Sequence, residues 1–309
     1  MRPYPEAKSE RQQMTYDLAI GDRTYSSWSL RGWLLFEKFG LPVRVHTGRL
    51  YSPDFNRLLG EFAPARLVPA MRTPEGWIIG ETLAIAETLA ERHPDAGLWP
   101  KDAEARSMAR WLAAEMHAGF GNLRNNCPMN LATSYADFAP SPEVLNDLKR
   151  IDELWGMVRM RFGSHGPWLF GTYSMADAFF APVAARIAGY NLPVSKAAEE
   201  YVASHLADLA FRRWRAMGKA ENHEQAHYRQ PFTERAWPGP NPLPAKLSDG
   251  PSVNATCPYS GKPVTDYLEF DGRVWGFCNR FCRDKTMADP EAWPKFMAIT
   301  GERADVNHS

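Results

Sequence analysis

The chain has 309 residues, with 36 Lys and Arg against 36 Asp and Glu, so its formal net charge is zero. A balanced charge without a basic block argues against a nucleic-acid or anionic-membrane partner, and no apolar run reaches the roughly 18 residues that span a bilayer. Residues 1–14 lack the apolar segment of a secretion signal, so we expect a flexible tail and a cytoplasmic location.

A small α/β domain is expected over residues 15–98, because strand and helix patterns alternate there. The expected elements are, in order, the strand Tyr16–Ile20, a helix over 30–39, the strands Val43–Thr47, 70–71 and 77–79, and the helix Thr82–Arg92. From residue 99 to 222 the pattern predicts helices only. These helices cover 102–131, Pro142–Phe162, 174–189 and 196–217.

A proline-rich stretch follows the helical part. Six prolines stand between Pro231 and Pro251 without helical or strand periodicity, and proline fixes φ and removes a backbone donor. We therefore predict a semi-extended linker over residues 223–253. The alternative is an ordered strap that packs on a domain through Phe232 and Trp237.

Four short motifs occur in order along residues 16–222. They are Ser-Ser-Trp-Ser-Leu-Arg at 26–31, Leu-Val-Pro-Ala at 67–70, Glu-Thr-Leu-Ala-Ile at 81–85 and Gly-Thr-Tyr-Ser-Met-Ala-Asp at 171–177. In this order they resemble the glutathione transferases, and within them the serine-using branch that includes zeta-class maleylacetoacetate isomerases. The resemblance implies a thioredoxin-like glutathione-binding domain followed by an all-α domain, with glutathione as the co-substrate and a homodimer as the assembly.

Two hydroxyls stand directly before the first expected helix, at Ser26 and Ser27. Free N–H groups and the positive end of the helix dipole favour an anion there, and a hydroxyl that donates to a thiolate lowers the pKa of the thiol. The resemblance implies Ser26 as the catalytic hydroxyl, with Ser27 as the second choice. The alternative is that both only cap the helix. Arg31 either adds positive potential or pairs with a surface acid.

The resemblance places the rest of glutathione on two further motifs. It implies a cis bond between Val68 and Pro69, which presents the Val68 backbone to the cysteinyl part of the tripeptide. It also implies that Glu81 meets the γ-glutamyl ammonium, while the Thr82 hydroxyl and the N-terminus of its helix hold the neighbouring carboxylate. The alternative for Glu81 and Thr82 is a helix cap and nothing else.

The second substrate is expected to be an electrophile of apolar or mixed character. One expected helix offers Met116, His117, Phe120 and Arg124 at spacings of one turn. A stripe of Met and Phe is also the pattern of a buried core, and His117 is either an acid–base group or a satisfied histidine. Cys127 has no His or second Cys near it in the sequence and is interpreted as a plain thiol.

A separate small module is expected over residues 254–300, with a tail at 301–309. Strand patterns at 267–270 and Arg273–Phe277 enclose an Asp-Gly turn and predict a β-hairpin. A short helix is expected over 290–298. The fold class predicted for the whole chain is therefore an α/β thioredoxin-like domain, an all-α domain and a small β-hairpin and helix module.

Three cysteines give this module its chemistry. Cys257, Cys278 and Cys282 have the spacing Cys-x20-Cys-x3-Cys, which resembles the YHS/TRASH-type metal-binding domain. Since so small a unit buries too little apolar surface to be stable without a metal or disulfides, we predict that the three thiolates hold zinc or copper(I). The candidates for a fourth ligand are Asp266, His308, water or a partner group. The alternative is a module with free thiols.

The sequence thus predicts a glutathione transferase, or a glutathione-dependent isomerase, in which a serine hydroxyl activates the thiol for attack on an electrophilic substrate. The alternative is a non-catalytic metal-sensing or metal-handling protein that uses the transferase fold as a scaffold for the cysteine module.

Overall fold

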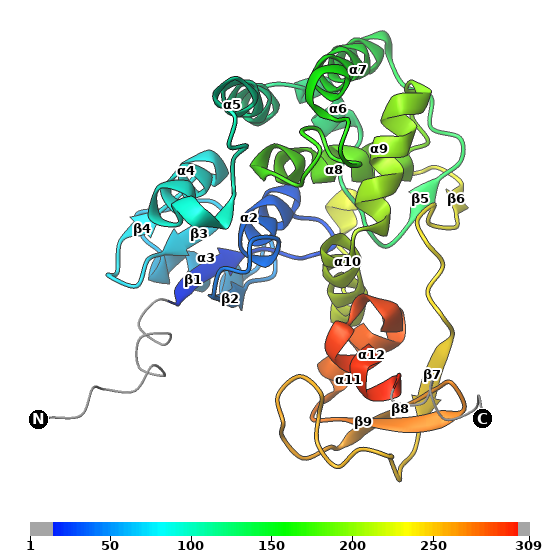
Figure 1. Ribbon diagram of the computed structural model, residues 1–309. Helices are drawn as coiled ribbons and strands as arrows, with labels where there is room; N and C mark the ends of the chain where they lie inside the picture. Colours follow the sequence, from blue (N-terminus) through cyan, green and yellow to red (C-terminus); the bar gives the residue numbers. More distant parts are fainter. Residues whose placement is uncertain (1–14, 302–309) are drawn as a thin grey trace, which may run out of the picture. The chain divides into compact units, whose positions relative to one another are not determined.

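The computed structural model describes residues 15–301 of the chain (Figure 1). The expected tails, residues 1–14 and 302–309, lie outside the described residues, and so does His308. The described chain forms two compact units. The first unit runs as far as His205 and includes Gln230–Ala236, and the second unit comprises Leu206–Arg229 and the chain from Trp237 onward.

The first unit begins with a four-stranded sheet and three helices (Figure 1). These elements are β1 (Tyr16–Ile20), α2 (Ser27–Glu37), β2 (Val43–Thr47), α3 (Pro53–Glu61), β3 (Ala70–Arg72), β4 (Ile78–Ile79) and α4 (Thr82–Arg92). The strand order is β2-β1-β3-β4, in which β1 pairs in parallel with β2 and the other pairs are antiparallel. The predicted thioredoxin-like order is confirmed.

Helix α3 is the element of this sheet domain that the sequence analysis did not predict. It begins at a proline, and the Ser52 hydroxyl caps it by accepting a bond from the Phe55 N–H at 3.2 Å. No residue of α3 is fully buried. Phe62, directly after the helix, packs with Ala19 of β1 and Ala70 of β3, and Leu58 of the helix packs against this cluster.

The approach of α2 to Pro69 depends on a glycine. A Cβ on Gly32 would lie 2.7 Å from both Cβ and Cγ of Pro69, closer than any normal carbon contact. We expect Gly32→Ala to lower the free energy of unfolding by about 1–3 kcal/mol through overpacking. Gly60→Ala in α3, where a Cβ meets nothing within 4 Å, is the matched control, with a gain of up to about 1 kcal/mol. Urea unfolding followed by circular dichroism measures both, and equal stability of the two variants would contradict the expectation.

The rest of the first unit is helical, as predicted. Its elements are the 3-10 turn Pro94–Ala96, α5 (Ala103–Ala118), α6 (Gly121–Asn126), α7 (Pro142–Phe162), α8 (Met175–Gly189), α9 (Lys196–Ala207) and the two-residue strands β5 (Ser134–Tyr135) and β6 (Glu234–Arg235). Helix α8 starts in a capping box, in which the Ser174 N–H donates to Asp177 Oδ2 at 2.8 Å.

Two of the predicted helices were wrong in extent, because each is broken by a local signal inside a continuous apolar pattern. The helix expected over 102–131 ends at Gly119, and Phe120 takes the left-handed φ of 57° before α6 begins. The helix expected over 196–217 is broken at Asp208. The Asp208 carboxylate caps the following helix by accepting from the N–H groups of Ala210 and Phe211, at 2.9 and 3.1 Å.

The second unit combines that following helix with the cysteine module. Its elements are α10 (Leu209–Glu221), the 3-10 turn Ala226–Tyr228, β7 (Ala245–Ser248), β8 (Asp266–Phe270), β9 (Arg273–Phe277), α11 (Arg280–Ala288), the 3-10 turn Pro290–Ala292 and α12 (Pro294–Thr300). The predicted hairpin is confirmed as β8 and β9, and β7 extends it to an antiparallel three-stranded sheet. The short helix expected over 290–298 begins later, at Pro294, and α11 was not predicted.

The division of the chain differs from the predicted one at two places. Helix α10, expected to close the all-α domain at residue 222, belongs to the same unit as the cysteine module because it packs on α11. The stretch predicted as a linker over 223–253 contains β6 and β7. Part of it is an ordered strap, since the Phe232 ring lies edge-on to Tyr135 and Phe138 of the first unit at 5.8 and 5.2 Å.

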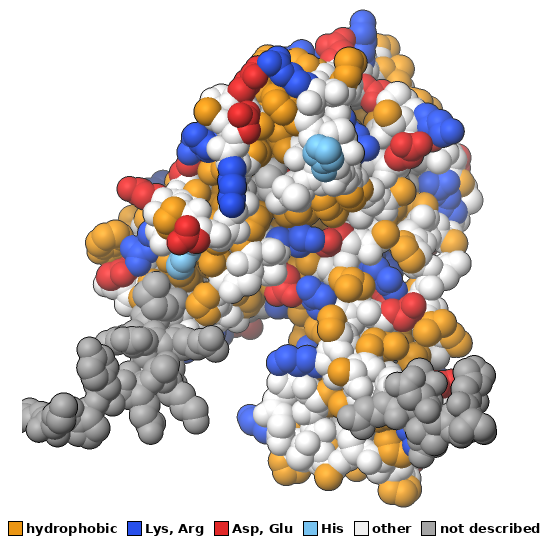
Figure 2. Space-filling model, in the orientation of Figure 1, with side chains coloured by type: hydrophobic (Ala, Val, Ile, Leu, Met, Phe, Trp, Pro, Cys, Tyr) orange, Lys and Arg blue, Asp and Glu red, His pale blue; other side chains and the backbone are white. Residues whose placement is uncertain are grey.

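Charged side chains of both signs are interspersed over the face drawn in Figure 2, as the zero net charge leads one to expect. None of the described helices is long and apolar enough to cross a membrane.

Candidate active site and metal centre

The start of α2 holds both candidate catalytic serines. Ser26 is the N-cap residue, and its hydroxyl accepts from the Ser29 N–H at 3.3 Å and donates to Ser29 Oγ at 2.7 Å. The N–H of Gly21 donates to the same Ser29 oxygen at 2.9 Å. The capping role weighed for Ser26 is therefore present, and its single proton already has an acceptor inside the fold.

Ser27 is the first residue of α2 and has a different environment. Its hydroxyl oxygen accepts a bond from Arg186 Nη2 at 3.4 Å. Within residues 15–301, no acceptor lies in hydrogen-bond geometry with the proton of this hydroxyl. Of the two serines, Ser27 is therefore the one whose proton remains for a ligand.

Arg31 is fully buried one turn into α2. Its Nε donates to the Phe179 carbonyl at 2.8 Å and its Nη1 to the Ser27 carbonyl at 3.3 Å, while Nη2 has no partner among the described residues. Burial, together with the charges of Arg186 and Arg124, lowers the pKa of this guanidinium well below its ordinary value. Pairing with a surface acid, the alternative weighed for Arg31, is not what the structure has.

Trp28 is the centre of this positive region. The guanidinium carbons of Arg31 and Arg124 lie 4.4 and 5.0 Å from its ring centroid. The His117 ring lies 5.0 Å from the same ring. Three cationic or titratable groups therefore surround one indole, and a site of this kind favours a negatively charged ligand.

His117 joins the predicted substrate helix to the predicted glutathione motif. Its Nε2 lies 3.3 Å from the Glu81 carboxylate, whereas Nδ1 is buried without a partner in the described chain. Burial lowers the pKa of His117, the charge of Glu81 opposes this, and Arg31 and Arg124 add to the lowering. His117 is thus held mainly neutral at pH 7, with one nitrogen directed at Glu81.

The two glutathione motifs lie at the edges of the same domain. The bond between Val68 and Pro69 is cis, as the resemblance implied, and leads directly into β3. Glu81 precedes α4 with a left-handed φ of 60° and makes no side-chain cap. Thr82, the first residue of α4, is buried. The helix-cap alternative is therefore absent for Glu81, and the first N–H groups of α4 lack a capping side chain.

The remaining predicted substrate residues divide between core and site. Met116 is fully buried in α5, as a core residue is, and Phe120 is mostly buried at the bend before α6. Arg124 lies against Trp28, as described above. Burial raises the pKa of the Cys127 thiol to about 12, so the interpretation of this cysteine as a plain thiol fits its environment.

Comparison with known proteins finds similarity to glutathione transferases in the first part of the chain. Residues 25–92 match the family described as glutathione S-transferase, N-terminal domain. A probable maleylacetoacetate isomerase of Caenorhabditis elegans is 35% identical over 103 residues, and the maleylacetoacetate isomerase of Dictyostelium discoideum is 29% identical over 119 residues. These matches cover 33% and 37% of this chain, and 47% and 52% of the relatives. The chain thus spans about half the length of each.

Solved structures extend the likeness into the helical part. A glutathione transferase homolog from Burkholderia gl BGR1, with bound glutathione, matches with a TM-score of 0.50 at 21% identity and covers 66% of this chain and 98% of its own. Over the matched part of the chain, the fold is that of the glutathione transferases. Glutathione transferase Omega 3C from Trametes versicolor also matches with a TM-score of 0.50, at 18% identity, over 72% of this chain and 97% of its own.

Two residues of this transferase-fold site were missed by the sequence analysis. Arg186 donates from Nε to the Cys127 carbonyl at 2.8 Å and reaches Ser27. The signal for it was an arginine in a stretch of α8 that is otherwise apolar after Asp177. Thr24 is a third hydroxyl, buried in the turn that precedes Ser26. No motif pointed to it.

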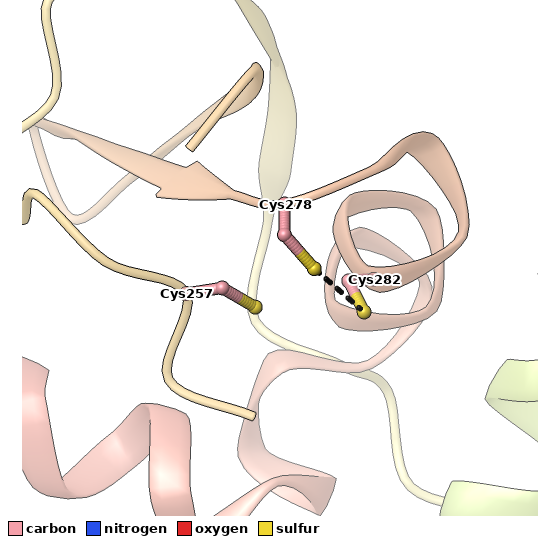
Figure 3. Close-up of side chains that lie close together, drawn as sticks. All are labelled: Cys257, Cys278 and Cys282. Carbon is pink, nitrogen blue, oxygen red and sulfur yellow. Dashed lines mark hydrogen bonds between the residues drawn. The ribbon is translucent and has the colours of Figure 1, made fainter. Parts of the chain in front are cut away.

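The cysteines of the second unit form a separate candidate metal centre (Figure 3). Cys257 lies on a loop, Cys278 follows β9 and Cys282 lies on α11, and their side chains point toward one another. All three sulfur atoms lie within 4.8 Å of one another, and the Sγ atoms of Cys278 and Cys282 are 4.0 Å apart. The structure thus brings the three predicted ligands together.

Hydrogen-bond donors surround these sulfurs. The Ser260 hydroxyl and the Asn279 amide both donate to Cys278 Sγ, at 3.1 and 3.3 Å. Burial opposes ionisation of Cys257, but N–H groups of the neighbouring backbone outweigh it and lower its pKa to about 7. Burial raises the pKa of Cys282 to about 12. Cys257 therefore ionises more readily than Cys282.

Asp266, one of the candidate fourth ligands, does not join the sulfurs. Its Oδ1 accepts from Arg283 at 3.2 Å and its Oδ2 from the Thr265 hydroxyl at 2.9 Å. In the part of the chain that the structure describes, no fourth Cys, His, Asp or Glu is grouped with the three cysteines. In the structure, Asp266 is paired with a guanidinium and is not grouped with the sulfurs.

Proposed function

We propose that the first unit is a glutathione-dependent enzyme, a transferase or an isomerase, which ionises the glutathione thiol at the start of α2. The observation that carries the proposal is the Ser27 hydroxyl at the first residue of α2, held by Arg186 at 3.4 Å beside the buried Arg31. Positive charge in a site of low dielectric favours the thiolate, and Ser27 donates its proton to the sulfur. Ser26, the first choice from sequence, then acts as the cap that fixes this turn.

Glutathione is proposed to extend from this point along the sheet edge. The backbone of Val68, directly before the cis proline, pairs with its cysteinyl part. Its γ-glutamyl carboxylate lies at the uncapped N-terminus of α4, beside Thr82. Its ammonium meets Glu81, whose carboxylate His117 orients from α5.

The electrophile is proposed to carry negative charge as well as apolar surface. Trp28 and Phe120 supply the apolar wall, and Arg124 with Arg31 supplies the positive potential. The two curated relatives are maleylacetoacetate isomerases, which agrees with a site for an acidic, unsaturated substrate. The predicted homodimer and cytoplasmic location stay predictions.

Both reactions start from the same step. The thiolate forms a carbon–sulfur bond to the electrophile, either by displacing a leaving group, which departs with its electron pair, or by adding to a double bond. In conjugation the new bond is kept. In isomerisation the carbon–carbon bond rotates while single, the thiolate leaves again, and glutathione is regenerated with no net oxidation or reduction.

The test combines binding with activity on the full-length chain. We expect calorimetry to detect binding of reduced glutathione, and Ser27→Ala to lower kcat/KM for an aryl halide or a cis-enedione acid about 10²–10³-fold. Ser26→Ala is expected to cost about 1 kcal/mol of stability through the lost cap. Thr24→Val tests the third hydroxyl.

Ser107→Ala on α5, where the hydroxyl is exposed and bonded only to the Ala103 carbonyl, is the matched control and should leave kcat/KM unchanged. Absence of glutathione binding by the folded chain would refute the proposal. Full activity in Ser27→Ala together with loss of activity in Thr24→Val would move the thiol-activating role to Thr24.

A second function is proposed for the second unit, because its three cysteine sulfurs converge within 4.8 Å. We infer that this YHS/TRASH-like module binds a thiophilic metal, zinc or copper(I), for a structural or sensing role. Soft thiolates prefer these ions to magnesium or calcium. Elemental analysis of the purified chain, before and after incubation with each metal, tests this, and failure to bind either ion with all three thiols titrating freely would refute it.

A further inference from the structure

We propose that the three-cysteine cluster is a three-coordinate site that selects copper(I) over zinc. The inference rests on the proposed metal role of the module and goes beyond it by naming the ion and its coordination number. The observation behind it is the ligand set: three sulfurs are grouped together, and in residues 15–301 no carboxylate or imidazole joins them.

The spacing of the sulfurs fits one ion without rearrangement of the backbone. With a metal–sulfur bond of about 2.3 Å, a planar three-coordinate ion separates its sulfurs by about 4.0 Å. The Sγ atoms of Cys278 and Cys282 are 4.0 Å apart, and Cys257 Sγ lies within 4.8 Å of both. Small side-chain rotations therefore bring all three sulfurs to bonding distance from one ion.

The number of ligands separates the two ions. Structural zinc is held by four protein ligands in a tetrahedron, whereas a zinc site with three keeps an open position for water. Copper(I) is softer and is favoured by thiolate ligands. The site that the described residues form, with three thiolates and no fourth protein ligand grouped with them, therefore satisfies copper(I) and leaves zinc incomplete.

Two acids of the module are tied to arginines. Asp266 pairs with Arg283, and Asp284 pairs with both Arg280 and Arg283, at distances of 2.8–3.2 Å. A carboxylate that moved to a metal would leave these guanidinium groups without a partner, and such pairs are costly to break when partly buried. The arginines thus keep the acids away from the fourth position.

Neutral donors and one lysine offset the charge of the filled site. Three thiolates and one copper(I) sum to −2. The Ser260 hydroxyl and the Asn279 amide donate to Cys278 Sγ, and the Lys285 ammonium, held 3.9 and 4.0 Å from the ring centroids of Tyr259 and Trp293, lies near Cys282. Excess negative charge is therefore stabilised without a fourth ligand.

Access to the cluster is one-sided. Cys257 is buried, whereas Cys278 and Cys282 are partly exposed. A donor thiolate can pass an ion to the two exposed thiolates, as thiolate-to-thiolate exchange requires. The buried thiolate then completes the coordination of the ion. We therefore expect an exchangeable site rather than a permanently closed one.

The test uses the reduced full-length chain, loaded without oxygen with copper(I) alone or with zinc alone. X-ray absorption spectra and metal-to-protein ratios are the measurements. We expect one copper per chain with three sulfur neighbours and no lighter neighbour, zinc with three sulfurs and one oxygen, and displacement of bound zinc by an equal amount of copper(I). Copper(I) bound through two sulfurs, or zinc held by a fourth protein ligand and not displaced, would overturn the inference while leaving the metal role intact. Binding of neither ion would refute the metal role itself.

Three variants make the assignment specific. Cys282→Ser should reduce bound copper from one per chain to none, and Cys127→Ser, which removes the buried thiol of the first unit, should leave it at one. Asp266→Asn should also retain one copper with three sulfurs. Because Cys282→Ser can unfold the module, the spectrum of Asp266→Asn decides independently: loss of a light-atom neighbour in that variant would identify Asp266 as a ligand and contradict the three-coordinate site.

Discussion

Replacing Arg186 by methionine is expected to raise the pKa of the thiol of bound glutathione and to lower kcat/KM about 10²-fold. Arg186 Nη2 donates to the Ser27 hydroxyl at 3.4 Å, so it occupies a lone pair of that oxygen and leaves the Ser27 proton directed away from the arginine. Methionine removes both this constraint and a buried positive charge, and each loss disfavours the thiolate.

The effect is expected to exceed that of removing a surface charge because the site is shielded from water. Arg186 and Arg31 are both buried, and Coulomb interactions at low effective dielectric are several times stronger than at the surface. Arg31 remains in the variant, which is why a shift in the thiol pKa is expected rather than complete loss of ionisation.

The pH dependence of thiolate absorbance in the glutathione complex measures the pKa directly. Arg186→Lys separates charge from geometry, since lysine keeps the charge without the planar fork. Arg161→Met, which removes an exposed guanidinium paired with Glu104, is the matched control and should leave the thiol pKa unchanged. A folded Arg186→Met protein whose bound thiol titrates as in the wild type would contradict the proposed role of Arg186.

The sequence predicted the elements that have a clear period and missed breaks within a continuous apolar pattern. Strands β1 and β2 and helix α4 follow from period and turn signals, and the cysteine cluster follows from spacing. The breaks at Gly119 and Asp208 were hidden because apolar periodicity continues across them. Their signals, a glycine and a capping aspartate, were visible but were outweighed by that periodicity.

The candidate active site was predicted only in part because its contacts join parts of the chain that are far apart in sequence. Ser26, Ser27 and Arg31 lie within one helix start and share one motif. Arg186 is 159 residues from Ser27 along the chain, and only the packing of α8 on α2 brings them together. The pairing of His117 with Glu81 likewise joins two separate motifs, which no pattern within either motif predicts.

The placement of helix α10 is the largest departure from the predicted domain order. One ion pair holds this helix in the second unit. Arg212 donates from Nε and Nη2 to the Asp289 carboxylate at 2.9 and 2.7 Å, and Nη2 also reaches Glu291 at 3.3 Å. The side chains of Arg212 and Asp289 are 13% and 7% exposed. The pair is thus two-pronged and nearly buried, and it joins α10 to the segment after α11.

We expect Asp289→Ala to destabilise the second unit by about 3–5 kcal/mol, because a buried guanidinium loses its main partner. Lys246→Met, which removes an exposed pair between β7 and β8 with side chains 71% and 37% exposed, is the control within the same unit and should cost at most about 1 kcal/mol.

Hydrogen exchange read by mass spectrometry resolves this loss by region. In Asp289→Ala, amides of α10, α11 and the β7-β8-β9 sheet are expected to exchange about two to four orders of magnitude faster, the factor that corresponds to 3–5 kcal/mol where exchange follows opening. Amides of β1 and α2 should keep their rates, since those elements belong to the first unit. The contrary result is faster exchange in the module alone, with the amides of α10 still protected. In that case α10 would belong with the all-α domain, as the sequence predicted. The ion pair would then be a contact between independently stable parts.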